Sequence, residues 1–325
     1  MIIVTGGAGF IGSAIVHSLN QRGHDDIWIV DVDDHQEKKK NLEGLTHTRF
    51  LDRDEFINAV RGGDVPKVEA IFHMGACSST TETDEDFLRI NNLEYTQTLA
   101  RFALDRDARY IYASSAASYG NGEQGYSDDE SRLDELKPLN PYGHSKHRFD
   151  LWARDEGLLK HIVGLKYFNV FGPNEYHKED MRSMVLKGHE QVRDTGRIRL
   201  FKSYRPEYAD GGQERDFVYI KDAVAMTLFF FDHPEVNGIF NIGSGSARNW
   251  NDLARAIFNA MGEKPFIEYI EMPASIRDQY QYHTCADIRK IREAGFNRSL
   301  SSLEEGVRDY ICEYLIPGRR LGSNP

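Results

Sequence analysis

The feature that most constrains the fold is a glycine-rich turn near the start of the chain, Thr5-Gly6-Gly7-Ala8-Gly9-Phe10-Ile11-Gly12. The turn directly follows a short β-type run, Ile2–Thr5, and opens a helical pattern. We expect Gly6 to allow a tight turn, Gly9 to let the backbone approach a pyrophosphate, and Gly12 to let the helix pack closely on the strand. Backbone N–H groups and the helix dipole then face the anion. This strand–turn–helix context predicts a dinucleotide-binding fold.

A second strand-like run, Ile27–Asp31, ends on an acidic residue about 20 residues beyond the turn, where a ribose-binding carboxylate is expected. Asp31 by itself favours NAD, because a carboxylate repels the 2′-phosphate of NADP. The cations that follow, Lys38 to Lys40 and Arg53, favour NADP, because a cation can neutralise a 2′-phosphate even beside an acid. The lysine run is equally consistent with a solvated surface patch, so residue spacing leaves the choice of dinucleotide open.

Strand-like and helix-like segments alternate through the first half of the chain. Further strand-like runs are Ala70–His73, Arg109–Ala113 and Ile162–Tyr167, and helical patterns cover Ile11–Gln21, Glu55–Arg61 and Phe87–Leu104. This alternation predicts an α/β fold, a Rossmann-type doubly wound parallel sheet.

The second half of the chain has a looser pattern and predicts a smaller, discontinuous C-terminal α/β substrate domain. We expect helices at Asp222–Phe231, Asn251–Met261 and Leu303–Leu315, strands at Ile239–Ile242 and Phe266–Ile270, and loops at Asn174–Met181 and Lys202–Glu214. The expected division gives residues 1–168 and about 216–248 to cofactor binding, and about 169–215 and 249–325 to a nucleotide-sugar.

Composition excludes several classes of function. The chain has 325 residues with 40 Lys and Arg against 51 Asp and Glu, a net charge of −11, which disfavours a nucleic-acid binder. The longest apolar run, Ala223–Phe231, is too short to span a bilayer, and no secretory signal is recognisable. The three cysteines are widely spaced without a C-x-x-C pair, so we expect neither a disulfide framework nor a metal site, and a cytoplasmic location.

The chemistry is predicted from a Tyr142-Gly143-His144-Ser145-Lys146 segment that follows Pro141 at the start of a helix. Residues four apart share one helix face. A tyrosine is a poor base at neutral pH, but a neighbouring ammonium favours the phenolate. We therefore expect Lys146 to lower the pKa of Tyr142 and make it a general acid/base for a hydroxyl that loses a hydride.

Two small-residue segments strengthen this interpretation, because each follows a strand at the carboxyl edge of the sheet, where ligands bind. Ser115 lies in YASSAASYG after Arg109–Ala113 and could hydrogen-bond the reacting oxygen. The loop Gly75-Ala76-Cys77-Ser78-Ser79 follows Ala70–His73.

Together, the motifs TGGAGFIG, YASSAASYG, NPYGHSK and YFNVFGP resemble the extended short-chain dehydrogenase/reductase superfamily, and the whole chain is similar to its ADP-L-glycero-D-manno-heptose 6-epimerase family. The resemblance to the heptose epimerase family rests on three further stretches, EAIFHMGACSSTTE, RDFVYIKD and GIFNIGSG, and on the neighbouring residues Glu175, His177 and Lys178. The resemblance implies an isomerase that acts on an ADP-heptose in the synthesis of the lipopolysaccharide inner core. It also implies NADP as the cofactor, a 6″-keto intermediate, and a homo-oligomer, specifically a homopentamer.

The resemblance also implies roles for individual residues. The acid/base residues are Tyr142 and Lys178, with Ser115 and Lys146 assisting. Cofactor positions are Gly6, Gly9, Phe10, Ile11, Gly12, Asp31, Val32, Lys38, Arg53, Gly75, Ala76, Cys77, Ser78, Ser79, Asn92, Lys146, Val170 and Lys178. Substrate positions are Asn169, Asp180, Lys187, Phe201, Lys202, Ser203, Tyr204, Arg215 and Tyr280. Asp180 and Lys187 depart from the residue types expected there.

Other functions remain possible at this stage. A 4,6-dehydratase is disfavoured, because Ala116-Ala117 stands where such enzymes carry an acidic pair. A UDP-hexose 4-epimerase keeps the same tyrosine and lysine, and another nucleotide-sugar enzyme of the superfamily stays open. A non-enzymatic dinucleotide sensor is disfavoured, because such a protein has no need for the Tyr142–Lys146 pair.

Overall fold

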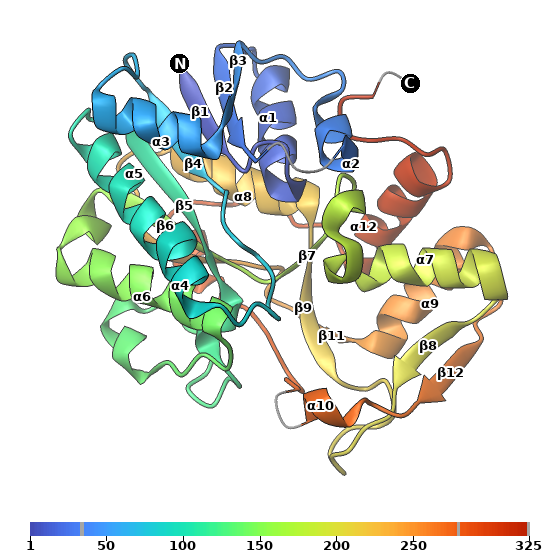
Figure 1. Ribbon diagram of the computed structural model, residues 1–325. Helices are drawn as coiled ribbons and strands as arrows, with labels where there is room; N and C mark the ends of the chain where they lie inside the picture. The colour runs from blue at the N-terminus through green and yellow to red at the C-terminus, as the bar shows by residue number, and fades with distance from the viewer. Residues whose placement is uncertain (33–35, 278–279, 324–325) are drawn as a thin grey trace.

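A computed structural model describes residues 1–32, 36–277 and 280–323. Its centre is a seven-stranded sheet with the order β10-β6-β5-β4-β1-β2-β3, in which every neighbouring pair runs parallel (Figure 1). The strands are β1 (Ile2–Thr5), β2 (Ile27–Asp31), β3 (Arg49–Asp52), β4 (Ala70–His73), β5 (Arg109–Ser115), β6 (Ile162–Tyr167) and β10 (Gly238–Ile242). The chain reverses its winding direction between β1 and β4, where doubly wound sheets bind ligands.

Alternating side chains of the strands feed two cores, one on each face of the sheet. Ile2 and Val4 belong to one core with the helices α1 (Phe10–Gln21) and α8 (Ile220–Asp232), and Ile3 belongs to the other. The second core includes residues of α3 (Arg53–Gly62), α5 (Tyr95–Leu104) and α6 (Pro141–Asp155). Helices therefore cover both faces of the sheet, as predicted.

Two small sheets form a second lobe beside the large one (Figure 1). One has the order β11-β9-β7 and the other pairs β12 with β8. Their strands are β7 (Asn169–Phe171), β8 (Ile198–Phe201), β9 (Glu214–Tyr219), β11 (Ala247–Asn249) and β12 (Ile267–Ile270). The helices α7 (Met184–Thr195), α9 (Trp250–Met261) and α12 (Leu303–Asp309) pack around them.

Short helices complete the path of the chain. They are α2 (Gln36–Lys39), η1 (Lys40–Leu42), α4 (Glu85–Leu88), η2 (Arg89–Glu94), η3 (Ala116–Tyr119), η4 (Glu130–Glu135), η5 (Leu158–Lys160), η6 (Tyr176–Met181), α10 (Ala274–Arg277), α11 (Arg289–Glu293) and η7 (Tyr310–Leu315). The predicted loop at Asn174–Met181 therefore contains η6, and the predicted helix Leu303–Leu315 changes from α12 to the π-type turn η7. β5 extends past the predicted Ala113 to Ser115, because Ser114 and Ser115 pair with β6.

Candidate active site

The glycine-rich turn is tightly packed against the loop that follows β4. Gly6 has a φ of +64°, and a Cβ atom there would lie 2.7 Å from the Gly75 backbone. A Cβ on Gly12 would lie 2.1 Å from the carbonyl oxygen of Gly6. Both positions therefore need glycine, and the first turn of α1 lies directly against the turn, as the dinucleotide prediction requires.

The Asp31 carboxylate at the end of β2 closes the other side of this turn. Its oxygens accept hydrogen bonds from the backbone N–H of Ala8 (3.0 Å) and of Val32 (2.8 Å). The Lys38 ammonium lies 2.5 Å from the same carboxylate, and the two side chains are only 15% and 5% exposed. A glycine cradle with an adjacent acid fits a nicotinamide dinucleotide, and the Lys38 ammonium offsets the negative charge of Asp31.

Asn92, at 1% exposure, joins the loop after β4 to the helix α6, which carries the predicted base Tyr142. Its amide oxygen accepts the Cys77 N–H at 2.9 Å, and its amide nitrogen donates to the Cys77 carbonyl and to the Ser145 hydroxyl, both at 3.0 Å. Arg53, at the start of α3, donates to the Asn91 side chain. Asn92 is thus placed to position the loop of residues 75–79, and Arg53 binds the residue that directly precedes Asn92.

Tyr142 sits in the first turn of α6, whose start is fixed by local sequence. The Asn140 side chain accepts the Gly143 N–H at 2.7 Å, and Pro141 occupies the first helical position, where it needs no N–H partner. Burial raises the pKa of the Tyr142 phenol, and a hydrogen bond with Ser115 partly offsets that rise. The structure therefore brings Tyr142 and Ser115 together.

The expected lowering of the Tyr142 pKa by Lys146 is wrong in direction. The Lys146 ammonium instead donates to the Ala113 carbonyl at 2.8 Å, at the carboxyl end of β5. Burial, more than any other cause, lowers the pKa of Lys146 to about 8. Desolvation of the buried phenol is the largest cause of its raised pKa, and the Lys146 ammonium is hydrogen-bonded to a backbone carbonyl rather than to the phenol.

A buried ion pair holds α6 against the strands β5 and β6. Asp150 on α6 and Lys166 on β6 are 2.9 Å apart, and both side chains are fully buried. Asp150 also accepts from Tyr112 (2.9 Å) and Ser114 (2.7 Å) on β5. The network ties α6 to the strand end that carries Ser115, which fixes the distance between the two catalytic candidates.

Lys178 lies in η6, next to Phe10 at the start of α1. Its ammonium is 5.2 Å from the centre of the Phe10 ring, at the first residue of α1. Burial lowers the pKa of Lys178, and the nearby buried Glu175 carboxylate raises it in part. Among the described residues, neither a hydrogen bond nor an ion pair joins Lys178 to Tyr142. The structure thus places Lys178 at the cofactor turn and Tyr142 beside Ser115.

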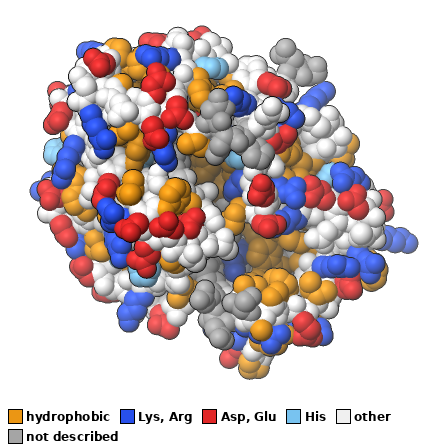
Figure 2. All heavy atoms as spheres, in the orientation of Figure 1, with side chains coloured by type: hydrophobic (Ala, Val, Ile, Leu, Met, Phe, Trp, Pro, Cys, Tyr) orange, Lys and Arg blue, Asp and Glu red, His pale blue; other side chains and the backbone are white. Residues whose placement is uncertain are grey.

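Several predicted substrate residues gather around one buried guanidinium in the second lobe. Arg215 is 7% exposed, and it lies 5.1 Å from the Tyr280 ring and 5.6 Å from the Trp250 ring. No carboxylate forms a salt bridge with Arg215 among the described residues, and burial lowers its pKa. Figure 2 shows a recess between the lobes with hydrophobic side chains on its floor and Lys and Arg at its border. A buried cation beside aromatic rings is suited to an anionic ligand.

The segment of residues 201–204 borders the same cluster. The ring of Phe201 lies 6.3 Å from that of Tyr280, and the Tyr204 N–H donates to the Tyr282 hydroxyl at 3.0 Å. Lys202 and the Tyr204 hydroxyl both bind Glu271, and Ser203 donates its N–H to Asp210 at 2.8 Å.

Of the remaining predicted positions, Asp180 lies in η6, Lys187 on α7, and Asn169 on β7 beside the predicted cofactor position Val170. Lys187 on α7 donates to the Asp180 carbonyl at 2.6 Å, so these two residues contact each other. Asn169 and Val170 lie on β7, where Asn169 is exposed and Val170 pairs with Val218. Within the described parts of the chain, no hydrogen bond, ion pair or ring contact joins these residues to Arg215.

Some residues that hold the site together were not predicted. Trp250 contacts Arg215 and donates to the Tyr280 hydroxyl at 3.0 Å. Asn41 is fully buried, and it donates to the carbonyls of Ala8 and Asn174 at 3.0 Å each. An isolated asparagine after a lysine run carries no periodic or motif signal, so only the tertiary structure identifies Asn41.

The described parts of the chain contain neither a helix suited to a membrane nor a cluster of metal-ligating side chains. None of the described helices combines the length and apolar character that a membrane crossing needs. In the same residues, no three His, Cys, Asp or Glu side chains gather as metal ligands would.

Comparison with known proteins adds to this geometry. The profile of the NAD dependent epimerase/dehydratase family matches residues 2–243. An ADP-L-glycero-D-manno-heptose-6-epimerase of Nitratidesulfovibrio vulgaris is 52% identical over 316 residues, covering 97% of this chain and 98% of that protein. One of Fusobacterium nucleatum is 46% identical over 97% of this chain and 98% of that protein. The solved structure of the Helicobacter pylori ADP-L-glycero-D-manno-heptose-6-epimerase has a TM-score of 0.81 at 28% identity, covering 96% and 95% of the two chains.

Proposed function

The chain belongs to the NAD dependent epimerase/dehydratase family and, within it, to the ADP-L-glycero-D-manno-heptose-6-epimerases, and from this premise we propose how it works. It is a nucleotide-sugar epimerase and an isomerase of heptose biosynthesis. It converts ADP-D-glycero-β-D-manno-heptose to the L-glycero epimer at C6″, through oxidation to a 6″-ketone and reduction from the opposite face. The observation that carries this proposal is a buried tyrosine, Tyr142, placed near Ser115 at the sheet edge that holds the glycine-rich turn.

Chemistry at C6″ favours a redox route. The carbon carries an unactivated C–H bond, so direct deprotonation is very difficult, whereas oxidation of its hydroxyl needs a hydride acceptor and a base. When bound, the nicotinamide supplies the hydride acceptor and then the donor. Oxidation breaks the C6″–H and O–H bonds, with the hydride leaving to the cofactor and the proton to a protein base. Reduction reverses both transfers from the other face of the ketone.

We assign the proton transfers to two residues, because the oxygen points in a different direction after the ketone reorients. Tyr142 takes or returns the proton in one orientation, with Ser115 holding the oxygen. Lys178 does so in the other, and its lowered pKa brings a neutral amine closer to physiological pH. Lys146 positions the cofactor and helps set the charge around Tyr142.

We propose NADP as the dinucleotide. The Lys38–Asp31 ion pair is largely buried, so the carboxylate that would repel a 2′-phosphate is already neutralised. Arg53 supplies a second cation, because it directly follows Asp52, which pairs with Asp31 in the register of β2 and β3. Denaturing the purified protein and identifying the released dinucleotide by mass tests this choice, and recovery of NAD alone would contradict it.

The ADP moiety is assigned to the second lobe. Arg215 is a buried cation without a carboxylate partner in the described residues. A diphosphate bound beside it would therefore neutralise its positive charge. Tyr280 and Phe201 offer flat surfaces beside it. We further propose that the enzyme works in the cytoplasm as a homo-oligomer, in lipopolysaccharide inner-core synthesis.

Separate substitution of the two proposed bases tests the assignment. We expect Tyr142→Phe and Lys178→Met each to lower kcat by about 10²–10⁴-fold, because each removes one acid/base group. Turnover is followed by NMR with the ADP-heptose, and with a UDP-hexose as the alternative substrate. Lys160→Met, an exposed lysine on η5, is the control and should keep full activity. Full turnover in Lys178→Met would show that one base suffices.

A further inference from the structure

Residues 319–322, here called the C-terminal strap, cross three segments that border the cofactor turn. After η7 the chain leaves the second lobe and passes beside α2 (Figure 1). Hydrogen bonds from the Gly318 N–H to the Leu315 carbonyl (3.3 Å) and from the Arg319 N–H to the Tyr314 carbonyl (2.8 Å) define its start. The segments that the strap contacts come from distant parts of the sequence.

The first contact is with α2. The Arg320 guanidinium forms an ion pair with Glu37, and the two side chains are 16% and 34% exposed. Glu37 directly precedes Lys38, whose ammonium pairs with Asp31. Arg320 therefore holds the short helix that brings Lys38 to the dinucleotide site.

The second contact is with the segment that carries Lys178. The Leu321 N–H donates to the Asn174 side-chain oxygen at 3.0 Å, and the Tyr176 hydroxyl donates to the Arg319 carbonyl at 2.8 Å. The Arg320 guanidinium also lies 4.8 Å from the Tyr176 ring. Asn174 is buried with a φ of +77°, so its surroundings hold it in a conformation that costs energy.

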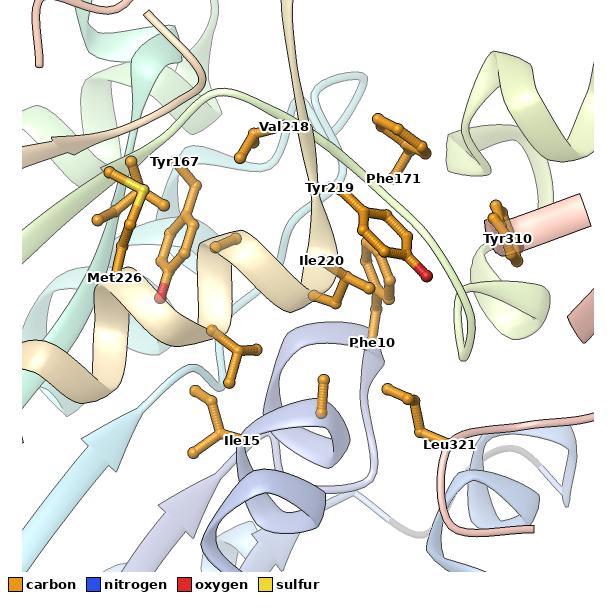
Figure 3. Close-up of a cluster of buried hydrophobic side chains, with 14 of the residues drawn as sticks. Phe10, Ile15, Tyr167, Phe171, Val218, Tyr219, Ile220, Met226, Tyr310 and Leu321 are labelled. Carbon is orange, nitrogen blue, oxygen red and sulfur yellow. The ribbon is translucent and has the colours of Figure 1, made fainter. Parts of the chain in front are cut away.

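The third contact is with the core beneath the glycine-rich turn. Leu321 is 4% exposed and belongs to the same hydrophobic cluster as Phe10 and Leu45. Figure 3 shows its side chain pointing from the C-terminal segment toward α1. The backbones meet closely as well, because a Cβ on Gly44 would lie 2.2 Å from the Gly322 carbonyl oxygen.

Asn41 joins these contacts to the turn itself. Its amide donates at 3.0 Å both to the Ala8 carbonyl, inside the turn, and to the Asn174 carbonyl, which lies in the residue that binds Leu321. A continuous set of buried hydrogen bonds thus runs from the strap through Asn174 and Asn41 to the turn.

We infer that the C-terminal strap positions α2 and the Lys178 segment against the dinucleotide and thereby slows its release. This inference rests on the proposed function, because it takes the turn to be the cofactor site. The reaction ends with the cofactor in its starting oxidation state, so the protein gains by retaining it over many turnovers. Arg320 and Leu321 are positioning residues that need not touch the substrate.

The test measures dinucleotide release without any sugar substrate. The protein is loaded with NADPH, excess NADP⁺ is added, and the loss of bound NADPH fluorescence gives the release rate. We expect Arg320→Met and Leu321→Ala to release NADPH at least about tenfold faster than wild type, a change that corresponds to roughly 1.4 kcal/mol. The pH profile of turnover should change as well, since the strap holds Lys178.

Matched variants separate this role from general destabilisation. Arg22→Met likewise breaks an arginine–carboxylate ion pair, at 2.8 Å to Asp232, and Leu159→Ala likewise removes a buried leucine, one that is 6% exposed. Both should lower Tm without speeding release. If Leu321→Ala does not fold, Arg320→Met decides. Release rates equal to those of the matched variants would overturn the inference alone, whereas a wild-type protein that binds no nicotinamide dinucleotide would overturn the proposed function with it.

Discussion

Burial keeps one histidine beside the site, His73, in its neutral form. His73, at the end of β4, is fully enclosed and hydrogen-bonded to Thr5 (2.6 Å) and Thr96 (2.9 Å). Thr5 in turn accepts the Gly75 N–H at 3.1 Å. Burial lowers the pKa of His73 from 6.5 to about 3, so the imidazole stays neutral in the folded protein. A neutral ring can bridge the two threonines, which keeps the loop after β4 against the glycine-rich turn.

The pH dependence of stability should report this histidine. Below pH 6.5 the unfolded chain binds a proton at His73 and the folded protein does not, until the pH approaches 3. The stability is therefore complete above pH 6.5 and is lost as the pH falls, by about 1.4 kcal/mol per unit. Urea titrations from pH 7 to 4 should show a shallower loss in His73→Gln than in wild type. His161→Gln, at an exposed position, should follow wild type; equal slopes in all three would refute the assignment.

At the residue scale, the sequence predicted where the glycines, Asp31 and Tyr142 lie in the fold, because those positions depend on local backbone conformation and spacing, and their functional roles stay predictions. It could not predict that Lys146 turns to the Ala113 carbonyl, since that contact joins a helix to a strand 33 residues earlier. Asn41 and Arg320 were missed for the same reason: each acts through partners that only the fold brings near.

Among the elements, the helix α6 matters most for the proposed catalysis, because its first turn contains Tyr142. Replacing the cap in Asn140→Ala removes the hydrogen bond to the Gly143 N–H and should cost about 1 kcal/mol of stability. We also expect a lower kcat, because fraying displaces the phenol from Ser115. Thermal unfolding and turnover are measured on the same samples.

A matched helix cap provides the control for this prediction. Ser302→Ala removes the capping box of α12, which lies in the second lobe, and should cost a similar stability without lowering kcat. If both variants lose activity in proportion to their stability, the position of Tyr142 does not depend on the α6 cap.

Prediction of the elements succeeded where the pattern was strong. The runs Ile2–Thr5, Ile27–Asp31, Ala70–His73 and Ile162–Tyr167 are confirmed as strands at those bounds, because buried parallel strands are nearly continuous apolar runs. The strands β7 and β11 have three residues each and gain their pairing from β9, so they leave no periodic signal. The edge strand β3, Arg49-Phe50-Leu51-Asp52, is too polar and short to stand out.

At the scale of the whole molecule, we propose that the two lobes divide the ligands as the sequence suggested, with the dinucleotide on the large sheet and the nucleotide-sugar in the second lobe. Arg215→Met should then weaken ADP binding about ten- to a hundredfold, since a buried charge-assisted contact is lost. NADPH affinity should not change. Calorimetry with each ligand measures both, and Arg255→Met, an exposed site, is the control. Equal weakening of both ligands would contradict the division.

The central claim concerns the fate of one hydrogen, the one bound to C6″. A hydride that leaves for the bound cofactor and returns to the opposite face never exchanges with water. The direct measurement is turnover in heavy water, with NMR or mass analysis of the epimer. The account predicts no solvent deuterium at C6″ of the product; deuterium at that carbon, incorporated during inversion, would contradict it.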